Sequence, residues 1–230
     1  MVNCILVLWN ILIERNILNC LIPLNFPGAD DDCKLILDIC FIMDSSGSLA
    51  REYHKEKQFL NAVIDNLNLG ENEVRAGVIT FSYYVELSIK LNQFYRREDF
   101  KKKVTSIPLM RSTTRIDKAL RMVQNEFFSV SNGARPGIPK LVILMTDGTQ
   151  SKGRDVVDPG DIADEIRSAG IPVVVIGIGK GINAKELEHI SGGPDTLFMA
   201  QSFDELISGG FIKTFMSGKC KAGKDFKLNV

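Results

Sequence analysis

Residues 35–48 read LILDICFIMDSSGS, a near-continuous apolar run that ends in an aspartate, a glycine and three serines. An apolar run bounded by turn residues is typical of a strand buried on both faces of a parallel sheet. A second run, Leu141 to Met145, ends in the same way, in Thr146-Asp147-Gly148. Carboxylates and hydroxyls at the ends of two buried strands predict an oxygen-only cluster without thiols or imidazoles, which hard divalent cations prefer.

Strand-like and helix-like segments alternate from residue 34 onward. Tyr53 to Leu67 carries an apolar stripe at helical spacing, and Val74 to Phe81 reads as a buried strand with Val85 to Lys90 as its antiparallel partner. This alternation predicts an α/β fold, a Rossmann-like, doubly wound, mostly parallel sheet with one antiparallel edge strand and helices on both faces. The other expected elements are helices at 100–107, 116–128, 162–169, 184–190 and 203–215, and strands at 173–178 and 197–199.

Ligands of such sheets bind outside the carboxyl ends of the strands, where the pattern places both Asp44 and Asp147. The motif Asp44-x-Ser46-x-Ser48 directs alternate side chains to one side of a turning loop. Gly47 lets the backbone of that loop bend without a steric penalty. An Asp-Gly pair also follows another predicted strand, far away in the sequence. The two strand ends together make it improbable that the Asp-x-Ser-x-Ser pattern occurs by chance.

A third loop, Arg111 to Arg115, precedes a predicted helix and contains one serine and two threonines. One interpretation is that a hydroxyl of this loop joins the oxygen cluster. The other is that Thr113 or Thr114 caps the helix that follows, which is a common role for threonine. The residues alone leave both interpretations open.

The charge and the histidines argue against two function classes. The 28 basic and 28 acidic residues balance, and the longest basic run, Lys101 to Lys103, is too short for the basic stripe of a nucleic-acid binder. A nucleophilic triad needs a base, but the two histidines, His54 and His189, lie on predicted helices away from the strand ends. No Gly-x-x-x-x-Gly-Lys-Ser/Thr phosphate loop occurs. We therefore expect neither a nucleic-acid partner nor an enzyme.

The five cysteines, an odd number, are Cys4, Cys20, Cys33, Cys40 and Cys220. Cys40 lies inside the first buried strand and is expected to be a core residue. Cys33 and Cys220 flank the periodic region almost symmetrically, which indicates a disulfide that joins its two ends. Two unrelated free thiols are the alternative.

Residues 1–32 differ from the rest of the chain. Ile5 to Ile13 is apolar apart from Asn10, but Glu14 and Arg15 interrupt the run before it could span a bilayer. A secretory signal with cleavage near Ala29 is the expected interpretation, and a poorly formed leader or a mistaken start competes with it because the usual basic start is missing. The expected organisation is a leader at 1–32, one domain at 33–220 and a polar tail at 221–230.

Several segments, in order, resemble von Willebrand factor type A domains, also called integrin I domains. The resemblance covers roughly residues 34 to 216. It is carried by the opening LDICFIMDSSGS at 37–48, by VRAGVITFS at 74–82, by 112–120, by LMTDG at 144–148, by GIP at 170–172 through GIG at 177–179, and by FDEL at 203–206. Cys33 and Cys220 look like the terminal pair seen in the extracellular matrix members of this family.

The resemblance implies a metal-ion-dependent adhesion site for Mg²⁺ or Mn²⁺. Carried over by position, Ser46 and Ser48 bind the ion through their hydroxyls, and Thr114 supplies the hydroxyl of the middle loop. Asp44 and Asp147 bind the ion directly or through water. Ile116-Asp117 departs from the Thr-Gly pair that is common in the family, so Asp117 is expected either to add a carboxylate near the site or to cap the helix.

The implied function is extracellular adhesion. Mg²⁺ requires octahedral oxygen coordination, and a Glu or Asp side chain of a partner can fill the position that the protein leaves open. The expected partner is collagen, another matrix protein, a cell-surface receptor or a second copy of the chain, and the expected location is the extracellular matrix. The alternative is a type A domain that binds its partners through a metal-free face.

Overall fold

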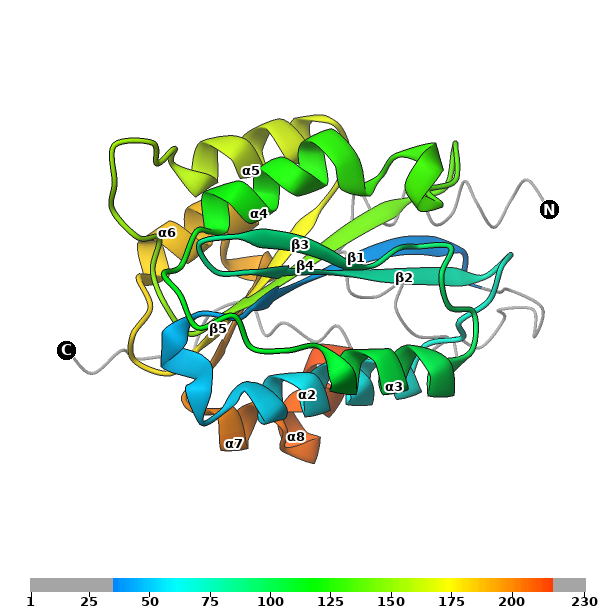
Figure 1. Ribbon diagram of the computed structural model, residues 1–230, viewed down its shortest axis with the longest axis horizontal. Coiled ribbons are helices and arrows are strands. Elements are labelled where there is room, and N and C mark those ends of the chain that lie inside the picture. Colours follow the sequence, from blue (N-terminus) through cyan, green and yellow to red (C-terminus); the bar gives the residue numbers. More distant parts are fainter. Residues whose placement is uncertain (1–34, 217–230) are drawn as a thin grey trace.

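A computed structural model describes residues 35–216 of the 230-residue chain. Within this range, six strands form one sheet in the order β3-β2-β1-β4-β5-β6 (Figure 1). Every neighbouring pair is parallel except β2 with β3. The sheet confirms the predicted fold class, including the antiparallel edge strand. The strands are β1 (Leu37–Asp44), β2 (Val74–Phe81), β3 (Val85–Ile89), β4 (Lys140–Thr146), β5 (Val173–Ile178) and β6 (Leu197–Ala200).

Helices cover both faces of the sheet (Figure 1). One layer contains α2 (Tyr53–Asp65), α3 (Arg97–Ser106), α7 (Phe203–Leu206) and α8 (Gly209–Met216). The other layer contains α4 (Ile116–Met122), which continues into a π-helical turn at Val123–Phe127, α5 (Pro159–Ser168) and α6 (Ala184–Ser191). Short 3₁₀ helices lie at Gly47–Ala50, Val130–Asn132 and Pro194–Thr196.

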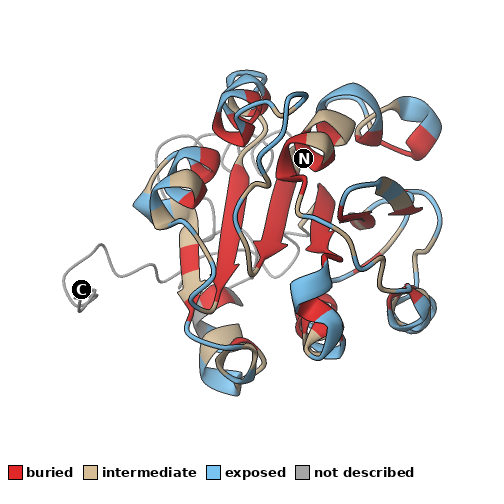
Figure 2. Cartoon of the chain, turned by 60° about the vertical axis from the view of Figure 1, so that its left-hand side comes forward, coloured by how far each residue is buried: buried red, intermediate tan, exposed pale blue. Residues whose placement is uncertain are grey.

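The central strands are buried on both faces because each face packs against a helical layer (Figure 2). All eight residues of β1 are buried, and its apolar residues alternate between two apolar clusters. Ile39 and Phe41 pack toward α2, whereas Ile42 and the free thiol of Cys40 belong to the cluster of α4 and α5. This arrangement explains why the strand is a continuous apolar run rather than an alternating one.

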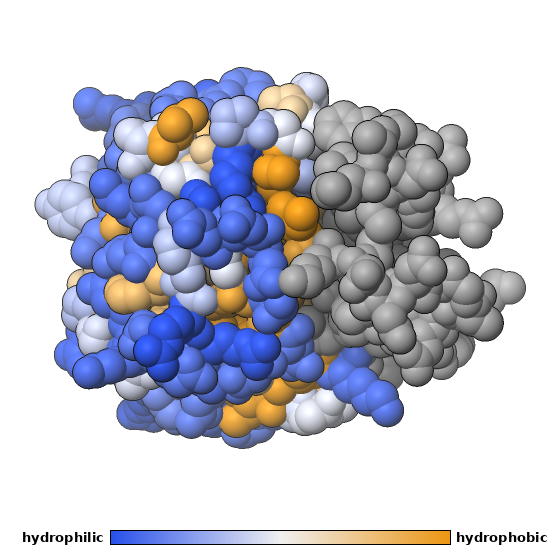
Figure 3. All heavy atoms as spheres, turned by 90° about the vertical axis from the view of Figure 1, so that its right-hand side faces the viewer, coloured by the Kyte–Doolittle hydropathy of each residue, from blue (hydrophilic) through white to orange (hydrophobic). Residues whose placement is uncertain are grey.

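The edge where the parallel strands begin is closed by a buried ion pair. Asp38, fully buried at the start of β1, accepts bonds from Arg135 Nη2 (2.6 Å), Nε (2.9 Å) and backbone N (2.8 Å). Arg135 Nη2 also donates to the carbonyl oxygens of Leu37 and Glu73. Figure 3 views this edge, whose described surface is mainly hydrophilic with separate apolar patches.

One predicted helix is wrong. The apolar stripe at 203–215 predicted a single helix, but the structure has two, α7 and α8, that break at Ile207-Ser208. Ser208 Oγ accepts a bond from Phe211 N (3.1 Å), so it caps a new helix. The glycines at positions 209 and 210 have low helix propensity, which favours a break there over a continuous helix.

Several predictions fall outside the described residues. These are the leader at 1–32, the polar tail at 221–230 and both members of the expected Cys33–Cys220 disulfide. Within residues 35–216, no helix combines the length and apolar character that crossing a bilayer requires.

Candidate metal centre

The parallel pairing of β1 with β4 brings the predicted cluster together. Met43 pairs with Met145, so the residues that follow, Asp44 and Thr146, lie side by side at the carboxyl edge of the sheet. Asp147 comes one residue later. This edge is on the left of Figure 1, where the short 3₁₀ helix at Gly47–Ala50 follows β1.

Asp44 is fully buried, and both of its carboxylate oxygens accept hydrogen bonds. Ser46 N donates to Oδ1 (2.8 Å) and Thr146 Oγ1 donates to Oδ2 (2.6 Å). Burial raises the pKa of Asp44 to about 6; these hydrogen bonds lower it in part, and the nearby charge of Asp147 raises it further. The two hydrogen bonds therefore fix the orientation of the carboxylate, but both donors are neutral and do not balance its negative charge.

The two serines connect this buried carboxylate to the surface. Ser46 Oγ lies 3.0 Å from Ser48 Oγ, and Ser48 Oγ donates to Asp147 Oδ1 (2.8 Å). Ser46 is buried, Asp147 is half-buried and Ser48 is exposed, so the cluster opens to solvent at Ser48. Burial also raises the pKa of Asp147, although the bond from Ser48 lowers it in part.

The middle loop is held against the serine loop by backbone hydrogen bonds. Gly47 N donates to the carbonyl oxygen of Ser112 (2.9 Å), and Arg111 N donates to that of Ser45 (3.0 Å). Arg111 has a φ of 57°, a left-handed conformation that is uncommon for a residue other than glycine. The pairing brings the third loop to the strand ends, which is where the family resemblance implied that it lies.

Thr114 reaches the same cluster from the side of Asp147. A β-carbon added to Gly148 would lie 3.4 Å from Thr114 Oγ1, and Thr114 exchanges two hydrogen bonds with Ser151. The capping alternative is wrong, because Arg115 occupies the N-cap position of α4 and the first-turn N–H of Asp117 donates to Gln150 Oε1 (3.1 Å) rather than to a threonine.

Asp117 has a role that neither expectation described. Its carboxylate is buried and accepts two bonds from the guanidinium of Arg115, both 2.8 Å, and one from Gln150 Nε2 (2.8 Å). The same carboxylate accepts from Val157 N (3.3 Å). Asp117 is therefore neither a free carboxylate of the site nor a helix cap; it joins the middle loop to the loop after β4.

Glu56 on α2 is a residue near the site that the sequence did not indicate. It is buried, and its Oε1 accepts from Asp44 N (3.1 Å). Its Oε2 is buried without a hydrogen-bond partner, and burial, followed by the charge of Asp44, raises its pKa well above the usual range. The available signal was an acidic residue on the apolar face of the helix, three positions before Phe59.

The donor set fits a hard divalent cation. Three hydroxyls and two carboxylates gather at one edge, and the pKa of both carboxylates is raised. Within residues 35–216, no lysine, arginine or histidine forms an ion pair with Asp44 or Asp147. Close to Asp44, Oε2 of Glu56 is a further buried oxygen without a hydrogen-bond partner. A bound dication would supply the missing positive charge, and oxygen ligands suit Mg²⁺ and Mn²⁺.

The sequence matches the family model for the von Willebrand factor type A domain over residues 38–209. The chain belongs to this family. The collagen alpha-6(VI) chain of Mus musculus is 33% identical over 180 residues, which are 77% of this chain and 8% of the collagen chain. Domains of this family in matrix proteins are adhesion modules. The relatives are secreted extracellular matrix proteins, which confirms the predicted localisation.

Two solved structures share the fold of this type A domain. Proximal thread matrix protein 1 of the mussel byssus, in a structure with a zinc-occupied MIDAS motif, superposes with a TM-score of 0.74 at 30% identity, over 82% of this chain and 49% of that one. Manganese-loaded TRAP protein of Plasmodium vivax has a TM-score of 0.63 at 26% identity, over 79% of this chain and 73% of that one. Both are similar structures in which a metal is present.

Proposed function

We propose that this type A domain captures an acidic side chain of an extracellular partner through Mg²⁺ or Mn²⁺ held at the carboxyl edge of the sheet. The observation that carries the proposal is the continuous series of hydrogen bonds from Asp44 through Ser46 and Ser48 to Asp147. Ser46, Ser48 and Thr114 would hold the ion through hydroxyls, and Asp44 and Asp147 through carboxylates or intervening water. When bound, the cation supplies a coordination position that a partner's carboxylate can fill.

The chain's own residues prepare this surface in two ways. Hydrogen bonds from Ser46 N and Thr146 Oγ1 fix Asp44 at the buried end of the cluster. Ser48 and Asp147 lie at the solvent end, where a partner can approach. The surrounding loops would determine which partner fits. The domain would act as a binding module rather than an enzyme.

The proposed partner is collagen or another matrix protein, or a second copy of the chain. The matrix character of the collagen VI relative supports this class. A type A domain that binds through a metal-free face is the alternative, and chelation separates the two.

Chelation is expected to abolish partner capture. Immobilised full-length protein incubated with an extracellular matrix extract should retain matrix proteins in buffer with Mg²⁺, lose them in EDTA and regain them when excess Mn²⁺ is added. The reason is that the partner's carboxylate binds to the cation. Without the cation, that carboxylate would face the negatively charged side chains of Asp44 and Asp147 directly. Retention that ignores EDTA would contradict the metal-dependent mechanism and favour the metal-free face.

We also propose that residues 33–220 form the domain, joined by a Cys33–Cys220 disulfide, and that 1–32 is a secretory leader. Alkylation of the secreted protein without reductant should then leave Cys33 and Cys220 unmodified, and mass spectrometry should find them in one cross-linked peptide pair. Alkylation at both positions would contradict the disulfide. Cys40 is fully buried and serves as an internal reference that reacts only after denaturation.

A further inference from the structure

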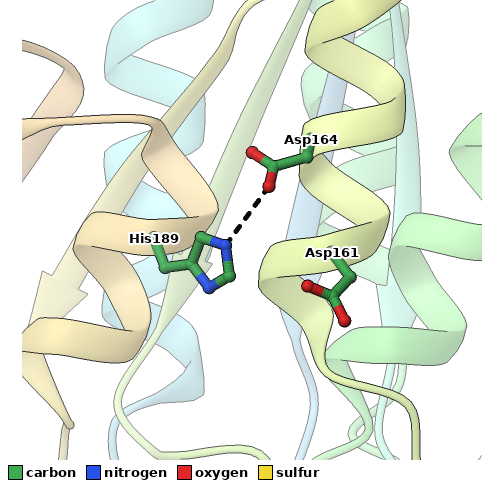
Figure 4. Close-up of side chains that lie close together, drawn as sticks. All are labelled: Asp161, Asp164 and His189. Carbon is green, nitrogen blue, oxygen red and sulfur yellow. Dashed lines mark hydrogen bonds and ion pairs between the residues drawn. The ribbon is translucent and has the colours of Figure 1, made fainter.

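A second group of metal-binding side chains lies on the outer surface of the helical layer. Asp161 and Asp164 are on α5 and His189 is on α6. One ligand atom of each lies within 4.8 Å of the other two. In Figure 4 the two aspartates project from one face of α5 toward the imidazole ring. Their spacing of three residues places both carboxylates on that face.

The position of the imidazole ring is defined by the residues around it. His189 Nε2 lies 3.3 Å from Asp164 Oδ2, and the other ring nitrogen, Nδ1, lies 3.8 Å from Asp158 Oδ1. The ring also covers Gly160 so closely that a β-carbon at that position would collide with it. Glycine at the start of α5 therefore makes room for the histidine of α6.

Arg167 fixes the second aspartate. Its guanidinium pairs with Asp164 Oδ1 and donates to the carbonyl oxygen of His189 (3.0 Å) and to that of Ile190. Asp164 Oδ2 is left directed at the imidazole. Metal ligands are commonly oriented by groups just outside the coordination shell. Here Asp158 would orient the imidazole through Nδ1, and Arg167 would orient the carboxylate of Asp164.

Three carboxylates, of Asp158, Asp161 and Asp164, surround one imidazole, and within the described residues only Asp164 pairs with an arginine. An exposed ion pair contributes at most about 1 kcal/mol, so these pairs offset little of the repulsion among the three carboxylates. One nitrogen and two oxygens form a donor set that suits Zn²⁺, whereas Mg²⁺ and Ca²⁺ prefer oxygen alone. We propose that Asp161, Asp164 and His189 form a zinc site that joins α5 to α6, with its remaining coordination positions open to solvent. It is separate from the oxygen cluster at the strand edge.

Calorimetric titration of the full-length protein with Zn²⁺ tests this site. A relative holds zinc in its adhesion motif, so the titration is done with the Asp147→Ala variant, in which the strand-edge cluster is disabled. One Zn²⁺ should still bind. Adding His189→Ala to this background should weaken that binding at least about tenfold, and Asp161→Asn should weaken it similarly. His54→Ala, which removes the other exposed histidine, is the matched control and should change nothing.

Two outcomes would overturn the zinc site. One is unchanged Zn²⁺ affinity in both His189→Ala and Asp161→Asn, and the other is complete loss of Zn²⁺ binding in Asp147→Ala alone. Titration of His189→Ala with Mg²⁺ reports on the strand-edge cluster independently, because no residue is shared. Failure of the zinc site would therefore leave the adhesion proposal intact, and the reverse also holds.

Discussion

Replacing Asp44 by asparagine is expected to abolish cation binding while leaving the metal-free domain at least as stable as the wild type. Loss of a carboxylate next to a cation removes about 4 kcal/mol of attraction per unit charge at an effective dielectric constant of 20. Mg²⁺ affinity should therefore fall at least about a hundredfold. Capture of a partner should disappear with it. Calorimetry with Mg²⁺ and the matrix-retention assay measure both effects.

The expected stability follows from the direction of the pKa shift. Burial raises the pKa of Asp44 from 3.8 to about 6, so the folded domain binds the Asp44 proton more tightly than the unfolded chain. Stability from this group is fully present below pH 3.8 and is lost as the pH rises through 6, by up to about 3 kcal/mol. In EDTA, Asp44→Asn should match the wild type at pH 4 and exceed it at pH 7, as measured by urea unfolding.

Asp38→Asn is the matched control, because Asp38 is equally buried at the other end of β1. This carboxylate is paired with Arg135 (2.6 Å), so its replacement leaves a cation uncompensated. We expect the opposite pattern: lower stability with unchanged Mg²⁺ affinity. If Asp44→Asn keeps wild-type Mg²⁺ affinity, the metal assignment of Asp44 is wrong.

Four of the predicted site residues owe their common position to one physical origin. Asp44, Ser46, Ser48 and Asp147 each follow a buried apolar run, and the ends of adjacent parallel strands must meet at one edge of the sheet. Local pattern and sheet geometry therefore place them together without knowledge of any side-chain contact. Thr114 was found through its position in the family pattern, and the structure ties it there through Ser151.

The features that the sequence did not predict depend on contacts that no local pattern encodes. Asp117 is bound by Arg115, Gln150 and Val157, and no periodicity connects the three. The break between α7 and α8 has a similar cause. The apolar stripe continues through 203–215, and one serine hydroxyl at position 208 decides where the second helix begins.

Asp117→Asn is expected to destabilise the domain and to weaken the cation site at the same time. The pair with Arg115 is buried, and removing one partner of such a pair costs roughly 3 kcal/mol. Only Asp155, whose side chain is largely exposed, then remains as an ionic partner of Arg115. The same change loosens the connection between the loops that carry Thr114 and Asp147. Mg²⁺ affinity should fall about tenfold, as for a residue that orients metal ligands. Urea unfolding and calorimetry measure the two effects.

The pH dependence distinguishes this role from a general loss of packing. Burial alone would raise the pKa of Asp117, but hydrogen bonds from Arg115, Gln150 and Val157 N outweigh it and hold the pKa below its usual value. A lowered pKa stabilises the fold above the ordinary aspartate pKa of about 4 and loses that contribution as the pH falls further. The stability difference between wild type and Asp117→Asn should therefore be full at pH 7 and shrink below pH 4.

Asp65→Asn is the matched control. It breaks the exposed pair with Lys101 and should cost less than about 1 kcal/mol of stability. Equal losses in the two variants would contradict the assignment of Asp117 as the tether between the loops.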